Sequence, residues 1–252
     1  MRLMAPLLAS PKTTRVTSFN LPPGRQIGGK YLVEQKLGSG QEGEVYKVVE
    51  RRTGITRAAK LFFPHRNEAD RAVTVYAQRM ERVRKSPIVI QYHHSEVIRC
   101  RGVNVTALIS DFVEGELLVD YVRRQPRRRL HPYEALHLIY AVARGLEEIH
   151  AAREYHGDIH DGNVLVKRQG IFWDVKLVDF YNWGRTTAAH YRDDVIFLVR
   201  MLYDILGGRE TYAGQPAIVK HICRGLRSDL IGAEFPTARH LREFLDSYLW
   251  TE

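Results

Sequence analysis

Apolar and polar residues alternate in short stretches over the first half of the chain, which is typical of β-strands. Three of these stretches are separated by a glycine-rich turn and an Arg-Arg-Thr-Gly turn, and they cover residues 30–37, 43–50 and 56–63. Their spacing predicts an antiparallel meander. Two further strands are predicted after a helix, at residues 95–101 and 104–113.

The helix between these strands is predicted over residues 67–85, where apolar side chains recur at three- and four-residue spacing. From about residue 117 helices dominate, and the longest covers residues 131–153 with Pro132 in its first turn. Three more helices are predicted near 192–206, 216–227 and 237–249, with two short strands at 163–167 and 174–180. The pattern predicts an α+β protein with a small β-rich half and a larger helical half.

The first 26 residues carry Pro, Thr and Ser without periodicity, which predicts a poorly ordered N-terminal segment over residues 1–26. One folded domain is expected over residues 27–252, with a first lobe at 27–113 and a second at 114–252. A chain of 252 residues is long enough for such a two-lobed domain.

Composition constrains location and partners. No run reaches the roughly 18 apolar residues that cross a bilayer, and the first residues lack the long apolar core of a signal peptide. Cys100 and Cys223 match no metal-ligand or redox spacing, so we expect reduced thiols and a cytoplasmic protein. The net charge is +9, much of it in residues 123–129, but no aromatic residues are interleaved there to stack on bases. A nucleic acid is therefore not expected as the principal partner.

Two features of the β-rich half indicate an anion site. Gly38, Gly40 and Gly43 lie between two predicted strands, so a hairpin is expected whose backbone can approach phosphate groups without an intervening Cβ. A purely structural glycine turn is the alternative. Lys60 lies at the middle of the third strand, and a half-buried lysine there favours an anionic partner. A lysine that reaches out to solvent is the alternative.

The stretch from residue 155 to 166 gathers five polar residues: His156, Asp158, His160, Asp161 and Asn163. Carboxylate and amide oxygens suit a hard cation, and Asp179 ends a predicted strand 21 residues after Asp158. A zinc site built on the two histidines is the competing interpretation, but no third zinc ligand is evident nearby.

With these motifs in one order, the chain resembles the protein-kinase superfamily over roughly residues 30–250. The resemblance implies a two-lobed kinase-like fold, with a small antiparallel sheet lobe carrying one helix and a larger helical lobe. It also implies ATP and Mg²⁺. By resemblance the three glycines cover the phosphates, Lys60 holds the α- and β-phosphates, Asp158 is the base or orienting group for the acceptor hydroxyl, and Asn163 and Asp179 bind magnesium.

The resemblance also assigns the adenine site. The backbone of Asp111 and Val113 would bond to the base, and Val45, Ala58 and Leu165 would sandwich the ring. In the helical half, Asp194 falls where a carboxylate is expected to bind the backbone of the loop that carries Asp158, because a buried carboxylate requires such partners.

The chain departs from the kinase pattern at several positions. The loop reads His-Gly-Asp, with Gly157 where an arginine is usual, and His160 replaces a lysine. Tyr181 follows Asp-Phe in place of glycine. Only 14 residues separate Asp179 from Asp194, and no Ala-Pro-Glu motif is present.

The acid that would pair with Lys60 is not evident from the sequence. At the matching position of the predicted helix there is no acid, and Glu68 and Glu81 lie only on nearby faces.

These features favour a protein Ser/Thr kinase without a full activation segment, because residues 28–48 closely resemble bacterial Ser/Thr kinases. The alternative is a kinase of a small hydroxylated molecule, of the aminoglycoside phosphotransferase type, which the His-Gly-Asp form resembles. A pseudokinase that serves as a nucleotide-binding or regulatory module is the non-enzymatic alternative. The sequence does not define the oligomeric state.

Overall fold

The computed structural model describes residues 16–170, 172–180 and 184–248, which divide into two units. The sheet unit contains the described residues up to 73 together with residues 95–109. The helical unit contains residues 74–94 and the described residues from 110 onward. The predicted two-lobed α+β fold is confirmed. Among the described residues, no helix is long and apolar enough to cross a membrane.

A six-stranded sheet has the strand order β1-β2-β3-β4-β6-β5. Its strands are β1 (Gln26–Ile27), β2 (Tyr31–Ser39), β3 (Gly43–Glu50), β4 (Thr56–Phe62), β5 (Tyr92–Cys100) and β6 (Val103–Asp111). β1 to β4 pair in antiparallel fashion. The predicted meander and the five predicted strands are therefore confirmed, with ends that differ by a few residues.

The two faces of this sheet have different roles. Tyr46 and Val48 on β3 are buried together with Ala59 and Leu61 on β4, and they belong to one apolar core. Because side chains alternate along a strand, the residues between them lie on the opposite face. That second face carries the predicted nucleotide-binding residues of the two strands.

Glu44, which is fully buried on β3, joins the start of the described chain to the sheet. Its carboxylate accepts hydrogen bonds from Ser18 Oγ (3.0 Å), from the backbone nitrogens of Phe19 (3.2 Å) and Asn20 (3.1 Å), and from Lys36 Nζ (2.7 Å). The Tyr46 hydroxyl also donates to it. Residues 18–20, within the segment predicted to be poorly ordered, are thereby attached to β3; residues 1–15 of that segment lie outside the described residues.

Burial alone would raise the pKa of Glu44, but the bonds from Lys36, Tyr46, Asn20 and Ser18 outweigh burial and lower the pKa from 4.5 to about 2. A carboxylate with a lowered folded-state pKa stabilises the fold above its unfolded-state pKa, and this stabilisation is lost as the pH falls toward the folded-state value. We expect Glu44→Gln to lower the free energy of unfolding by about 3 kcal/mol at pH 7. The difference from the wild type should shrink between pH 5 and pH 2 in urea-unfolding measurements. A difference that stays constant over this range would contradict the role of the carboxylate charge.

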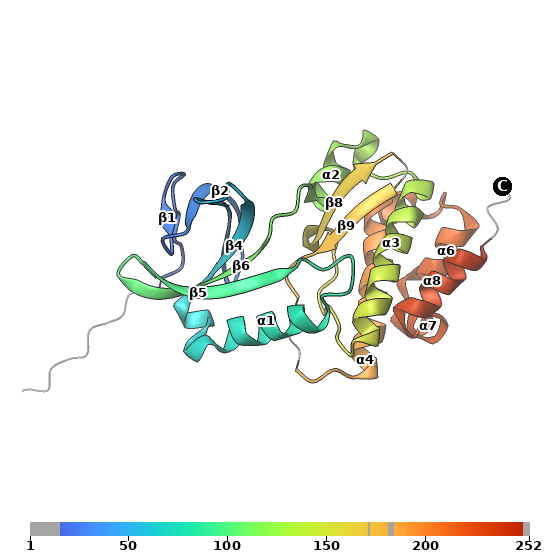
Figure 1. Cartoon of the computed structure of the whole chain (residues 1–252). Helices are drawn as coiled ribbons and strands as arrows, with labels where there is room; N and C mark the ends of the chain where they lie inside the picture. The colour runs from blue at the N-terminus through green and yellow to red at the C-terminus, as the bar shows by residue number, and fades with distance from the viewer. Residues whose placement is uncertain (1–15, 171, 181–183, 249–252) are drawn as a thin grey trace, which may run out of the picture. The chain divides into compact units, whose positions relative to one another are not determined.

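The helical unit contains a second sheet and most of the helices (Figure 1). The sheet has the order β7-β8-β9, with β7 at Glu116–Leu117, β8 at Val164–Gln169 and β9 at Phe172–Leu177. The helices are α1 (Arg71–Arg82, in this unit from residue 74), α2 (Leu118–Arg124), α3 (Pro132–Ala151), α4 (Ala188–Ile205), α5 (Arg209–Tyr212), α6 (Ala217–Cys223), α7 (Ser228–Glu234) and α8 (Ala238–Ser247). The longer helices match the prediction, whereas the short helices α2, α5 and α7 had no periodic signal of their own.

The helix α3 lies at the centre of the helical unit, between the β8–β9 hairpin and the C-terminal helices (Figure 1). Its buried face includes Leu138, Ile139, Val142 and Leu146, which are inaccessible to solvent. Burial of each such side chain contributes about 1.5–3 kcal/mol. This core fixes the helix that precedes the loop carrying Asp158.

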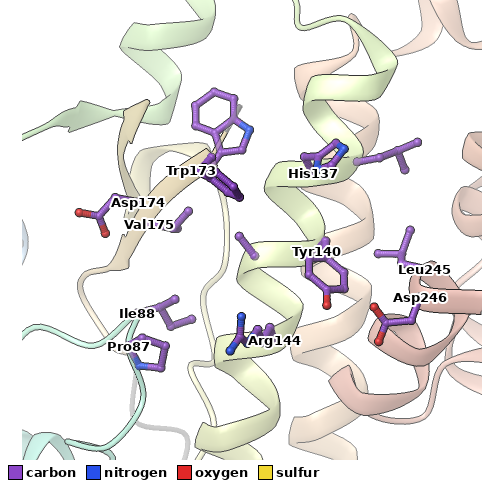
Figure 2. Close-up of a pocket in the computed structure, with 13 residues that line it drawn as sticks. Pro87, Ile88, His137, Tyr140, Arg144, Trp173, Asp174, Val175, Leu245 and Asp246 are labelled. Carbon is purple, nitrogen blue, oxygen red and sulfur yellow. The ribbon is translucent and has the colours of Figure 1, made fainter. Parts of the chain in front are cut away.

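A cavity of about 610 Å³ lies between α3, β9 and α8. Figure 2 shows Tyr140 and Arg144 of α3 facing it, with Trp173 of β9 and Asp246 of α8 also on its wall. None of the predicted site residues lines this cavity, so it is separate from the site described below.

Candidate active site

The predicted glycine-rich turn is the hairpin between β2 and β3, and it is closed by a bond from Gly40 N to Gly43 O (2.9 Å). A Cβ on Gly43 would lie 2.0 Å from the carbonyl oxygen of Leu61, so packing against β4 requires glycine there. A Cβ on Gly38 or Gly40 would meet nothing within 4 Å, and neither residue has a positive φ. The fold therefore does not require glycine at these two positions, which fits a hairpin that lets a ligand approach its backbone.

Three predicted site residues share the sheet face opposite the core. Val45 on β3 lies directly across from Lys60 on β4, and Ala58 is two residues before Lys60 on the same strand. Val45 and Ala58 are half-buried, and the side chain of Lys60 is 12% exposed. The sheet therefore presents one cation beside a small apolar surface, a combination that suits a nucleotide.

An acid contacts Lys60 from the glycine-rich hairpin. Glu42 Oε2 lies 2.8 Å from Lys60 Nζ, and about half of the Glu42 side chain is exposed. Of the two acids considered from the sequence, Glu68 is exposed and Glu81 pairs with Arg84 at 2.9 Å. The sequence pattern does not identify Glu42, because the resemblance implies an acid on the helix and Glu42 lies in the β2–β3 turn. The contact shows that Lys60 Nζ reaches an oxyanion at the hairpin, so the residues present fit phosphate oxygens.

In the helical unit, the loop after α3 brings Asp158 and Asn163 together. Asn163 Nδ2 donates to the carbonyl oxygen of Asp158 (2.9 Å) and to its carboxylate Oδ2 (3.2 Å). The amide nitrogen of Asn163 thus faces Asp158, which leaves its Oδ1 as the atom able to bind a cation. Half of the Asp158 side chain is exposed, so an acceptor can reach it.

The β8–β9 hairpin places Asp179 at the same end as Asn163. Val164 pairs with Leu177 in the hairpin register, and Val178 N donates to Asn163 O (3.0 Å). Asp179 follows directly, is exposed, and has φ +57°, a left-handed conformation that is uncommon for a residue other than glycine. Asp158, Asn163 and Asp179, to which the resemblance assigns the roles of base and magnesium ligands, therefore lie within one unit, with Asn163 and Asp179 at the same end of the β8–β9 hairpin.

The geometry of His156 does not fit the zinc alternative. Its Nε2 lies 2.9 Å from Val178 O, and its Nδ1 accepts a hydrogen bond from Asp158 N (3.3 Å), so both ring nitrogens have protein partners. Burial lowers the pKa of His156, which favours the neutral ring with the proton on Nε2. The ring also packs against Phe180, with centroids 4.5 Å apart. His156 thus links the Asp158 loop to Val178 and Phe180 by its two hydrogen bonds and its ring contact.

Asp194, at the buried face of α4, holds the loop by its backbone as predicted. Its carboxylate accepts bonds from His156 N (2.8 Å) and Gly157 N (2.7 Å), and it lies 3.1 Å from His150 Nε2. The side chain has no solvent exposure. Because each partner of a buried carboxylate limits its movement and that of the chain, this arrangement fixes the backbone just before Asp158.

The predicted adenine contacts are divided between the two units. Asp111, Val113 and Leu165 belong to the helical unit, whereas Val45 and Ala58 belong to the sheet unit. Asp111 N already donates a hydrogen bond to Gln91 O (3.0 Å). The bond to adenine that was predicted for the Asp111 backbone would therefore be accepted by the Asp111 carbonyl oxygen.

The structure describes two of the residues that depart from the kinase pattern, Gly157 and His160. Gly157 has φ +83°, which glycine adopts without strain, and His160 Nδ1 accepts a bond from Gly162 N (3.1 Å) at the start of the turn that ends at Asn163. Tyr181 lies outside the described residues. The helix α4 begins at Ala188, nine residues after Asp179.

A family model described as "Protein kinase domain" matches residues 31–194. The Ser/Thr-protein kinase PkaA of Streptomyces coelicolor is 29% identical over 165 residues, which cover 62% of this chain and 30% of PkaA. PknA of Corynebacterium glutamicum, named as a Ser/Thr-protein kinase, is 30% identical over 157 residues, covering 61% of this chain and 32% of PknA. The chain thus spans about a third of the length of these relatives. The kinase domain of Mycobacterium tuberculosis PknI has a TM-score of 0.64 at 20% identity, with 90% of this chain and 97% of that chain covered.

Proposed function

Because the chain belongs to the protein kinase family, we propose that it is an ATP- and Mg²⁺-dependent phosphotransferase whose acceptor is a serine or threonine hydroxyl of a protein. The observation that carries the proposal is the pair of bonds from Asn163 Nδ2 to Asp158, with Asp179 at the same end of the β8–β9 hairpin. The relatives named as Ser/Thr-protein kinases support the acceptor class. The cytoplasmic location remains a prediction from the sequence.

The proposed roles follow from the chemistry of the residues. Phosphoryl transfer forms a bond from the acceptor oxygen to the γ-phosphorus while the bond from that phosphorus to the β,γ-bridging oxygen breaks. Asp158 orients the acceptor hydroxyl and takes up its proton. Asn163 and Asp179 provide oxygen ligands for Mg²⁺, which when bound supplies positive charge against the phosphoryl oxygens. Lys60 holds phosphate oxygens, and the bare backbone at Gly38 and Gly40 permits their approach.

In this scheme Glu42 and the nucleotide compete for Lys60. The carboxylate and the phosphates have the same sign of charge, so the Lys60–Glu42 pair must open or be shared when ATP binds. We expect Glu42→Gln to tighten binding of Mg-ATP by about two- to five-fold, the range of a partly exposed ion pair. Isothermal titration calorimetry measures this change.

A matched control for this substitution is Glu81→Gln, which breaks the exposed Glu81–Arg84 pair (2.9 Å) outside the sheet and should leave the affinity unchanged. Weaker nucleotide binding by Glu42→Gln would instead show that this carboxylate supports the nucleotide.

The experiment that tests the function is transfer from γ-labelled ATP. Purified protein is incubated with Mg²⁺ and the label, alone, with generic protein substrates and with cell extract, and the products are separated by size. Label on serine or threonine of a protein is the expected result. Label on a small hydroxylated molecule would support the alternative acceptor class. His160 and the short segment of chain between Asp179 and α4 favour that class. If no sample shows transfer, and ATP with Mg²⁺ does not shift the thermal stability of the protein, the proposed phosphotransferase activity is contradicted.

A further inference from the structure

The helix α1 contributes a buried arginine to the helical unit. The Arg79 side chain is 6% exposed, and its Nε donates to Glu154 Oε2 at 3.0 Å. Its Nη2 donates to the carbonyl oxygen of Tyr155. The guanidinium carbon also lies 4.7 Å from the centroid of the Tyr155 ring and 5.8 Å from that of the Phe180 ring. One side chain of α1 therefore contacts two separate segments of the unit.

Both segments lead directly to the proposed active-site residues. Glu154 and Tyr155 immediately precede the His156–Asp158 stretch, and Phe180 immediately follows Asp179. Phe180 is buried and packs on the His156 ring. A shift of Arg79 would therefore act on the start of the Asp158 loop and on the residue beside Asp179 at the same time.

Stability alone does not account for this arrangement. Removing two charges from water costs several kcal/mol per ion, and replacing a buried ion pair by apolar side chains of similar volume is often neutral or stabilising. The apolar neighbours of Arg79 in α1, including Met80, already pack into the core of the unit. A guanidinium differs from an apolar side chain in its planar fork of donors, which fixes direction as well as distance.

Arg82 provides an internal comparison. It donates to the other oxygen of Glu154 at 2.6 Å, but half of its side chain is exposed. Exposed ion pairs contribute little to stability and little restraint. Among the residues of α1, the only acid is Glu81, which pairs with Arg84. The buried connection of α1 to the active-site segments is thus made by Arg79.

We propose that Arg79 is a positioning residue that couples α1 to Asp158 and Asp179, so that α1 acts on the active site through a guanidinium rather than through a carboxylate of its own. The proposal rests on the function proposed above. A displacement of α1 withdraws Arg79 from Glu154, Tyr155 and Phe180 together, and misplaces the two acidic residues.

Three variants test this role: Arg79→Leu, Arg82→Leu and the double variant Arg79→Leu/Glu154→Leu. The double variant also removes the buried Glu154 carboxylate, which the single variant leaves without the Arg79 guanidinium and paired with the half-exposed Arg82, so it keeps the test valid if Arg79→Leu fails to fold. For the double variant we expect kcat to fall roughly 100-fold, the cost of misplacing reacting groups by about 1 Å. Its dissociation constant for Mg-ATP should rise by less than the roughly 10- to 100-fold expected for loss of the Asp179 carboxylate, because that carboxylate is displaced but still present. Arg82→Leu should change both quantities by less than about two-fold.

Hydrogen–deuterium exchange provides a readout that does not depend on turnover. We expect amides of residues 155–163 to exchange roughly ten-fold faster in the double variant and at the wild-type rate in Arg82→Leu. A double variant with wild-type kcat and unchanged exchange in this segment would overturn the proposal. If the wild type transfers no phosphate, the proposed function fails, and the exchange rates alone then decide whether Arg79 positions this segment.

Discussion

Replacing Asp158 by asparagine is expected to lower turnover about 1,000-fold while leaving the dissociation constant for Mg-ATP within a few fold of the wild type. Loss of a positioned general base costs about 10²- to 10⁴-fold. Asparagine has nearly the same shape, and the bond from Asn163 Nδ2 to the backbone carbonyl of residue 158 does not depend on the side chain. The loop should therefore keep its conformation, and the loss should appear in kcat.

Steady-state transfer of γ-labelled phosphate to the acceptor measures kcat, and calorimetry measures nucleotide affinity. Asp161→Asn is the matched control, because Asp161 lies in the short turn that ends at Asn163 and has no proposed contact with the acceptor. Asp158→Asn with wild-type turnover would remove Asp158 from its role and, with it, the assignment of the loop.

The residues that sequence reasoning located are those whose signal is local. The strand pattern predicted Lys60 at the middle of the third strand. The resemblance to protein kinases assigned Val45 and also Asp158 and Asn163, the pair that the structure joins by hydrogen bonds. The resemblance also assigned Asp194, and the structure places its carboxylate against backbone donors of the loop. In each case neighbouring residues contain the information.

The features that sequence reasoning missed depend on contacts between distant segments. Arg79 looks like an ordinary polar position of a helix, and only the fold brings it to Glu154, 75 residues away. The bonds of Glu44 to residues 18–20 cross 24 to 26 positions. Glu42 is closer in sequence, 18 positions from Lys60, but the pair forms between the β2–β3 turn and β4 rather than along a helix face. Periodicity describes which face a side chain occupies and carries no information about its partner on another element.

These missed contacts change the expectation for a kinase-like chain whose only α1 acid, Glu81, pairs with Arg84 and not with Lys60. A lysine on the sheet needs a counter-charge when no phosphate is bound, and Glu42 provides one from the hairpin. The helix then retains a role in the helical unit through Arg79. Glu42 compensates the charge of Lys60, and Arg79 forms an ion pair with Glu154 just before the Asp158 loop. The absence of a helix glutamate that pairs with Lys60 therefore does not by itself indicate a pseudokinase.

Removing the carboxylate of Asp179 is expected to eliminate the Mg²⁺-dependent part of ATP binding. Asp179→Ala should weaken binding of Mg-ATP by at least about 10- to 100-fold, the range that even outer-shell changes at metal sites produce, and should bring it close to the affinity measured without metal.

The alanine variant also has a conformational cost that a control must separate from the loss of the carboxylate. Alanine at φ +57° is strained, which lowers the free energy of unfolding by about 1 kcal/mol. Asp179→Gly removes the carboxylate without this strain, and Asp174→Ala removes a different exposed acid of the same hairpin. Calorimetry with and without Mg²⁺ should show equal losses for the alanine and glycine variants and none for Asp174→Ala. Retained Mg²⁺ dependence in Asp179→Gly would place the metal on other residues.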